Sequence, residues 1–147
     1  MDFRNASIED AQLLYEWAID FETRENSFNS TSFNYESHIA WLNKKLEDKN
    51  SFILIFEDQK KDIGLCRLEI VDINKALISY SIDKNFRGKG YGRKIMSQIE
   101  AIAKMNNIHY LTAKVKVNNP ASLKIFESLG YVKSFQDGCL EFNKEIL

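Results

Sequence analysis

The chain has 147 residues, 44% of them hydrophobic, and a formal net charge of -1 at pH 7. A chain of this length buries about 70% of its unfolded surface in one core, so we expect a single domain over residues 1–147. Because 20 Lys and Arg are balanced by 21 Asp and Glu, bulk charge cannot hold a nucleic acid or an anionic membrane. We therefore expect neither as a partner, and any anion must be bound by a local cluster of cations.

The first part of the chain predicts a short strand, a helix and a loop. Residues 3–4 favour the strand, and Ser7 followed by Asp10 resembles a capping box that opens the helix. Apolar residues then recur at helical spacing as far as Phe21. Residues 24–33 are polar and break this period, so we expect a loop there.

The middle of the chain changes from a helical to a strand-like pattern. Asn34 suits the N-cap of a second helix, whose apolar residues fall on one side. Three successive strands are predicted after it, at residues 51–56, 63–70 and 76–82. Strands that follow one another through short turns indicate an antiparallel meander.

The last part of the chain alternates helices and strands. We expect a helix at 92–105, a strand at 110–117, a short helix after Asn119, and strands at 131–136 and 139–145. Asn119 suits the cap of the short helix and Gly130 its exit, while Asp137-Gly138 is a hairpin signal. The whole order of elements describes an α+β domain with a mixed sheet.

A glycine-rich segment lies between the third strand of the meander and the next helix, over residues 82–93. Its glycines, Gly88, Gly90 and Gly92, allow a tight turn and a close approach of the backbone to a ligand. The helix start adds unpaired N–H groups and the positive end of a dipole. Local positive charge comes from Arg87, Lys89, Arg93 and Lys94. Together these features predict a phosphate cradle.

The spacing of the glycines narrows the class of phosphate ligand. A dinucleotide fingerprint would need glycine at Arg93 or Ile95, and the G-K-[ST] of a Walker A loop does not occur in the sequence. The pattern that fits is Arg87-x-x-Gly90-x-Gly92. On this pattern the chain resembles the GNAT family of N-acetyltransferases.

A second signature of that family, N-x-x-A/S-x-x-x-Y followed by G-F, is approximated by residues 119–126 and 130–131. The resemblance implies the GNAT fold, a mixed, mostly antiparallel sheet of about seven strands flanked by about four helices. It also implies acetyl-CoA as cosubstrate, with the pantetheine arm paired to the strand that ends at Ile82. The cofactor-binding residues that it implies are Ile82, Arg87, Gly88, Lys89, Gly90, Tyr91, Gly92, Arg93, Asn119 and Ser122.

Acetyl transfer to an amine needs a donor for the developing oxyanion and a way for the thiolate to leave. The resemblance assigns the oxyanion donor to the backbone N–H of Ile82. The tyrosine that usually protonates the thiolate is replaced by Phe126 in this chain. A thiol pKa of about 8.5 makes the thiolate a tolerable leaving group near neutrality. Tyr131, Tyr91 or a water are the alternative acids.

The general base is expected on two neighbouring strands of the meander. Glu69 lies near the end of one strand, and Ser79 and Ser81 share one face of the next. Together they could hold a water that accepts the amine proton. A surface carboxylate without a catalytic role is the alternative for Glu69.

The segment before the meander resembles acetyltransferases of nucleotide-activated amino sugars, such as the pseudaminic-acid pathway enzyme. Trp17 falls where an aromatic ring of that group stacks on uracil, and the polar stretch around Arg24 and Ser27 falls where the sugar is surrounded. Lys114 and Lys116 share a strand face that suits an anionic acceptor. This resemblance implies a UDP-linked 4-amino sugar as acceptor. Core packing of Trp17 and a surface role for Arg24 are the alternatives.

Two other functions stay open. A protein or peptide amine is the alternative acceptor within the same enzyme class. Because Phe126 replaces the usual acid, a module that binds CoA without turnover is the alternative outside it.

The cysteines bear on metal binding and location. Cys66 and Cys139 lie far apart, with no Cys or His nearby at metal-ligand spacing, and the start of the chain has no apolar signal region. We expect no metal and a reduced, cytoplasmic protein. The exposed last strands could also pair two copies of the chain into a homodimer.

Overall fold

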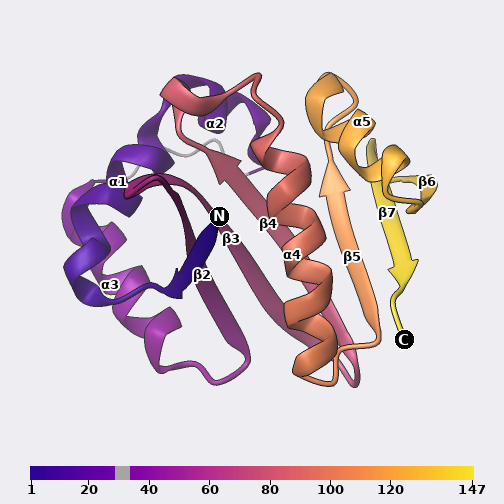
Figure 1. The fold of residues 1–147 in the computed structure, drawn as a ribbon, viewed down its shortest axis with the longest axis horizontal. Coiled ribbons are helices and arrows are strands. Elements are labelled where there is room, and N and C mark those ends of the chain that lie inside the picture. Colours follow the sequence, from indigo (N-terminus) through magenta and orange to yellow (C-terminus); the bar gives the residue numbers. More distant parts are fainter. Residues whose placement is uncertain (29–33) are drawn as a thin grey trace.

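A seven-stranded mixed sheet forms the centre of the computed structural model, which describes residues 1–28 and 34–147 (Figure 1). The strands are β1 Asp2–Asn5, β2 Ser51–Asp58, β3 Lys61–Asp72, β4 Lys75–Ile82, β5 Tyr110–Val115, β6 Val132–Gln136 and β7 Cys139–Glu145. They are ordered β1-β2-β3-β4-β5-β7-β6, and each neighbouring pair is antiparallel except β4 and β5. The predicted meander and the mixed, mostly antiparallel sheet are confirmed.

Helices cover both faces of this sheet. Within the described residues they are α1 Ala11–Ile19, α2 Phe21–Asn26, α3 Tyr35–Glu47, α4 Tyr91–Met105 and α5 Pro120–Ser128. The apolar run of β2 shows how the faces are shared, because successive side chains of a strand point to opposite sides. Ile53 and Ile55 pack with residues of α1 and α3, whereas Leu54 and Phe56 pack with residues of α4 and α5. The core therefore has two layers, one on each face.

Strands β4 and β5 are parallel neighbours that pair over three residues only, 75–77 with 110–112. Beyond this point they diverge, as their arrowheads show in Figure 1. Strand β5 continues to pair with β7 as far as Val115, whereas residues 78–82 of β4 pair with β3 alone among the described strands. The sheet is therefore open in a wedge between β4 and β5, and the edge of β4 that faces the wedge has no strand partner there.

Several local predictions are confirmed. The N–H of Ser7 donates to the Asp10 carboxylate at 2.8 Å, which completes the capping box. Asn119 caps α5 with its side chain. Asp137 and Gly138 both have positive φ, as the hairpin between β6 and β7 requires.

The predicted first helix and loop differ from the structure. Helix α1 ends before Asp20, whose ψ of 135° breaks the helical path and whose carboxylate accepts from the N–H of Thr23 at 3.1 Å. Asp20 therefore caps a new helix, and Phe21 at its start is 76% exposed instead of buried on the apolar face. Residues 24–26, predicted as loop, belong to α2, and residues 29–33 lie outside the described part of the chain.

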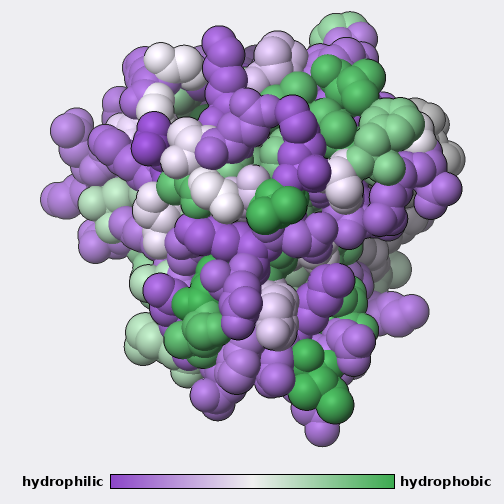
Figure 2. Space-filling view, turned by 90° about the vertical axis from the view of Figure 1, so that its right-hand side faces the viewer, coloured by the Kyte–Doolittle hydropathy of each residue, from purple (hydrophilic) through white to green (hydrophobic). Residues whose placement is uncertain are grey.

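The outer strand β6 carries exposed apolar side chains. Val132 is 71% exposed and Phe135 is 66% exposed. On this side of the molecule hydrophobic side chains form separate patches within a mostly hydrophilic surface (Figure 2). In the described ranges, no helix is both long and apolar enough to cross a bilayer. Among the same residues, no group of His, Cys, Asp and Glu is arranged to hold a metal ion.

Candidate active site

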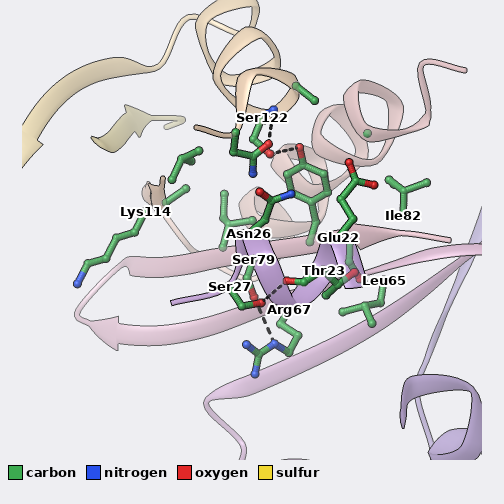
Figure 3. A pocket seen from close by; sticks show the side chains of 18 of the residues that line it. Glu22, Thr23, Asn26, Ser27, Leu65, Arg67, Ser79, Ile82, Lys114 and Ser122 are labelled. Carbon is green, nitrogen blue, oxygen red and sulfur yellow. Dashed lines mark hydrogen bonds between the residues drawn. The ribbon is translucent and has the colours of Figure 1, made fainter. Parts of the chain in front are cut away.

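A cavity of about 1280 Å³ lies at the wedge between β4 and β5 (Figure 3). Its wall brings together most residues predicted for the site: Arg24, Ser27, Glu69, Ser81, Ile82, Arg87, Gly88, Gly90, Tyr91, Gly92, Arg93, Lys114, Asn119 and Ser122. Trp17 and Lys89 do not belong to this wall. The ammonium of Lys89 lies 5.6 Å from the ring centroid of Phe86, beside the glycine loop.

The glycine loop has the backbone geometry of an anion site. Gly88 and Gly90 have φ of +75° and +83°, in the left-handed region that favours glycine. A Cβ at either position would meet no atom within 4 Å, so the backbone borders open space. Gly90 is the N-cap of α4 and offers no side chain to the first N–H groups of that helix. Free N–H groups and the helix dipole fit a pyrophosphate.

Arg87, predicted to contact the pyrophosphate, has other partners. Its guanidinium forms ion pairs with Asp20 at 2.6 Å and Glu22 at 2.7 Å, at the start of α2. Its Nε donates to the carbonyl oxygen of Ile82 at 3.1 Å. The side chain therefore joins α2 to the end of β4, and its charge is neutralised there. This corrects the predicted role, and Arg93, which is exposed, is a better placed cation.

The free edge of β4 presents backbone N–H groups to the wedge. The N–H of Asp83 donates to the carbonyl oxygen of Ile63 at 2.8 Å, on the β3 side. Because the backbone groups of successive residues point to opposite edges of a strand, those of Tyr80 and Ile82 point toward β5. This edge can pair with an amide-containing arm, and the N–H of Ile82 can donate to an oxyanion.

Trp17 is a core residue, which corrects its predicted stacking on a nucleobase. It is 6% exposed and packs in one cluster with Leu14 and Leu42. Its indole N–H donates to the Asp83 carboxylate at 2.8 Å. A ring buried in this way cannot stack on uracil, and its contacts fix α1 against the end of β4.

Glu69 lines the cavity but is too remote to be the base for an amine at Ile82. It pairs with Leu77, five residues before Ile82 on β4, which is about 17 Å along the strand. A base must reach the amine directly or through one water. The Glu69 carboxylate instead forms ion pairs with Lys45 at 3.2 Å and Arg67 at 3.4 Å. The structure therefore does not support the predicted role.

Glu22 is a carboxylate of the site that sequence reasoning missed. Its side chain lies close to Ile82 in Figure 3, and its ion pair with Arg87 holds it there. Ser81, adjacent to Ile82, also lines the cavity. The sequence pattern did not indicate that residues 21–26 form a separate helix, and this helix turns the side chain of Glu22 toward the wedge.

Cations line the half of the cavity that lies away from the loop. They are Arg24, Arg67 and Lys114. Arg67 is held in place by its Nε, which donates to Ser79 Oγ at 3.2 Å. Burial lowers the pKa of Arg24, and the charge of Arg67 lowers it further. Glu69 offsets part of this charge, but cations brought together in a cavity are stabilised by an anion. These side chains can therefore donate charged hydrogen bonds to an acidic group of a ligand.

The position of the usual acid is occupied by a buried ring. Phe126 is 2% exposed, and its ring centroid lies 5.2 Å from that of Phe142 and 5.0 Å from that of Tyr131. Tyr131 does not line the cavity. The Tyr91 hydroxyl donates to Asp58 at 2.6 Å, which raises the pKa of that phenol. Neither tyrosine considered as a substitute acid therefore has a hydroxyl placed for that role.

Asn119 and Ser122 line the cavity at the start of α5. Asn119 Oδ1 accepts from the backbone N–H of Ser122 at 3.4 Å, so its side chain caps the helix. The Ser122 hydroxyl lies 2.8 Å from the hydroxyl of Tyr80. Sequence reasoning missed Tyr80 because an aromatic residue within a strand has the pattern of a core residue.

Comparison with known families identifies the class of protein. The sequence matches the acetyltransferase (GNAT) domain family over residues 1–132. The chain therefore belongs to the GNAT acetyltransferase family. It is an acyltransferase that carries an acetyl group from acetyl-CoA to an amine. A curated relative, the uncharacterized N-acetyltransferase p20 of Bacillus licheniformis, is 25% identical over 142 residues, which are 90% of this chain and 79% of that protein.

Solved structures share the fold. A spermidine N-acetyltransferase from Vibrio cholerae, in complex with CoA and spermine, has a TM-score of 0.88 at 18% identity, covering 98% of this chain and 94% of that one. A ribosomal-protein-alanine N-acetyltransferase from Brucella melitensis has a TM-score of 0.81 at 21% identity, covering 99% of both chains. The predicted GNAT fold is confirmed by these similarities.

Proposed function

We propose that this N-acetyltransferase modifies a primary amine of a small anionic molecule, with a UDP-linked 4-amino sugar as the favoured acceptor. The observation that carries the proposal is the cationic half of the cavity, lined by Arg24, Arg67 and Lys114. Charged hydrogen bonds from these side chains suit a diphosphate. Ser27 lies on the same wall and offers a hydroxyl to the sugar.

Acetyl-CoA is proposed to bind to the loop and to the free edge of β4. Backbone N–H groups around Gly88 and Gly90 take the pyrophosphate, with Lys89 and Arg93 adding positive charge. The pantetheine amides pair with the edge that ends at Ile82, as an added strand would. The loop geometry and the unpartnered edge support this placement.

Transfer is proposed to occur by direct attack in a ternary complex. The amine nitrogen bonds to the thioester carbon, the carbon–sulfur bond breaks, and its electron pair leaves on sulfur. The N–H of Ile82 stabilises the oxyanion that develops. A water between Glu22 and Ser81 accepts the amine proton. The place of Glu22 beside Ile82 supports this assignment.

The charge of the acceptor distinguishes the proposed anionic substrate from a polyamine substrate. The Vibrio cholerae protein is a spermidine N-acetyltransferase. In this chain a polycation would meet Arg24, Arg67 and Lys114 in the acceptor half, which is unfavourable at short range. We therefore expect spermidine to be a poor acceptor here.

The test is thiol release from acetyl-CoA with a panel of acceptors. It includes UDP-linked 4-amino sugars, the same sugars without the nucleotide, spermidine and peptides. We expect kcat/KM for the UDP-linked sugar to exceed that for the free sugar roughly 100-fold, because the diphosphate is bound by charged hydrogen bonds. Turnover on peptides alone, or equal turnover with and without UDP, would overturn the proposed acceptor.

The edge of β6 is proposed to pair two copies of the chain. The unpaired edge of an outer strand is a template for another strand, and Val132 and Phe135 add exposed apolar surface to it. Sedimentation should show a dimer for the wild type and a monomer for Phe135→Lys. A monomeric wild type at tens of micromolar would contradict the pairing.

A further inference from the structure

Tyr80 of β4 and Ser122 of α5 form a hydroxyl pair in the wall of the cavity. Their oxygens are 2.8 Å apart, and both side chains line the cavity. Ser122 lies across the cavity from Ser79 and Arg67 in Figure 3, where the bond to its hydroxyl is drawn. The pair therefore joins the free edge of β4 to the helix that carries Phe126.

Either hydroxyl can donate in this hydrogen bond, and the acidity of the two groups assigns the donor. Burial raises the pKa of Tyr80, so its side chain stays a neutral phenol at physiological pH. A phenol is a stronger donor than an aliphatic hydroxyl, so we assign the donor role to Tyr80 and the acceptor role to Ser122 Oγ. The proton of Ser122 must then point away from Tyr80, toward the remainder of the cavity.

The surrounding residues hold Tyr80 in this position. A Cβ on Gly92 would lie 2.8 Å from Cδ1 of Ile125 and 3.4 Å from Cε2 of Tyr80, so the backbone of α4 packs closely against both side chains. The Phe126 ring packs against the Tyr80 ring, with 6.3 Å between centroids. The ring that replaces the usual acid thus supports the tyrosine that contacts Ser122.

The pair is close to the reacting thioester if acetyl-CoA binds as proposed above, and the inference rests on that binding mode. Tyr80 precedes Ile82 by two residues on the same edge, which is about 7 Å. In that binding mode the thioester lies in the part of the cavity that Ile82, Tyr80 and Ser122 line together.

We infer that Tyr80 is a positioning residue that aims the proton of Ser122 at the thioester sulfur. When the carbon–sulfur bond breaks, its electron pair stays on sulfur and the Ser122 hydroxyl donates a hydrogen bond to that anion. The amine proton goes to water, and the thiolate takes a proton from water after release. Tyr80 and Ser122 keep their own protons, and together they perform the task that Phe126 cannot.

The kinetic test compares Tyr80→Phe, Ser122→Ala and the double variant. Tyr80→Phe keeps the ring and should lower kcat about tenfold, with KM for acetyl-CoA within about twofold, because the Ser122 proton is then no longer held toward the leaving sulfur. The double variant should be no slower than Ser122→Ala, since Tyr80 acts through Ser122. Tyr131→Phe is the matched control, because it removes the phenol hydroxyl of another ring that packs against Phe126, outside the cavity. Equal kcat for Tyr80→Phe and Tyr131→Phe would overturn the inference, as would additive losses in the double variant.

A binding test separates this inference from the proposed function. The wild type should bind CoA more tightly than desulfo-CoA, and Tyr80→Phe should reduce that preference about fivefold in calorimetry. This result would support the inference even if no acceptor of the panel were acetylated. An unchanged preference in Tyr80→Phe would overturn it even if the proposed acceptor were correct.

Discussion

The two halves of the cavity are built in different ways. The cofactor half consists mainly of backbone: the turn at Gly88 and Gly90, the start of α4 and the free edge of β4. The acceptor half consists of side chains from separate elements, with Arg24 on α2, Arg67 on β3 and Lys114 on β5. A backbone site tolerates sequence change outside its glycines, whereas a side-chain site changes with each substitution. The cofactor half is thus the part a family can share, and the acceptor half is the part that distinguishes its members.

The largest effect is expected in the cofactor half. Gly90→Val should raise KM for acetyl-CoA at least about 30-fold, because a β-branched residue is strained at φ +83° and its side chain enters the pyrophosphate space. The matched control is Gly130→Val, at φ +84° in the turn after α5 and outside the cavity. It carries similar strain, so it should lower the melting temperature and leave KM unchanged. Steady-state kinetics with acetyl-CoA as the varied substrate would disprove the loop assignment if both variants behaved alike.

Charge reversal in the acceptor half should act on the other substrate only. Lys114→Glu is expected to raise KM for the UDP-linked sugar about tenfold, with KM for acetyl-CoA unchanged, because one cation facing the diphosphate becomes an anion. Lys124→Glu on the exposed face of α5, outside the cavity, is the control. If both substrates were affected equally, the two halves would not be separate sites.

The bridge between the halves is the ion pair of Arg87 with Asp20, and it predicts a pH dependence. Burial tends to raise the pKa of Asp20, but hydrogen bonds from Arg87 and Thr23 outweigh it, so the pKa lies below the ordinary 3.8. A carboxyl group whose pKa is lowered by folding stabilises the fold at pH values above its ordinary pKa. This contribution is lost as pH falls through the pKa that the group has in the folded protein. Asp20→Asn keeps a capping oxygen but removes the charge.

Thermal melts can measure this contribution. The wild type should be more stable than Asp20→Asn at about pH 6, and the difference should shrink as pH falls below 3.8. A difference that stayed constant over this range would show that the ion pair does not bridge the halves.

The smallest effect is expected where the cofactor half departs from the family pattern. Phe126→Tyr should change kcat by less than about threefold, because the Ser122 hydroxyl is already proposed to donate to the departing sulfur, and a thiolate of pKa about 8.5 leaves without full protonation. A gain well above this range in single-turnover assays would mean that the missing hydroxyl limits the rate.

Sequence reasoning reached the cofactor half because its determinants are consecutive. Arg87, Gly90 and Gly92 lie within six residues of one another, so their spacing along the chain is enough to carry the family resemblance that implies acetyl-CoA. It failed where three-dimensional contacts decide the role. Trp17 has the same helical spacing whether it packs in the core or stacks on a base, and only the fold shows that it is buried. The distance of Glu69 from Ile82 likewise depends on the strand register, which no pattern along the chain reveals.

The wedge between β4 and β5 has a consequence for the energetics of the whole protein. The sheet carries an open seam in its middle, where the amides of Tyr80 and Ile82 have no partner from β5. Their hydrogens should exchange rapidly with solvent in the free protein and slowly once acetyl-CoA completes the ladder. Binding of the ligand then raises the free energy of unfolding by about 2.7 kcal/mol when the ligand is at 100 times its Kd. In the proposed binding mode the cosubstrate acts as a removable strand, and the supply of acetyl-CoA sets how firmly the two sides of the sheet are held together.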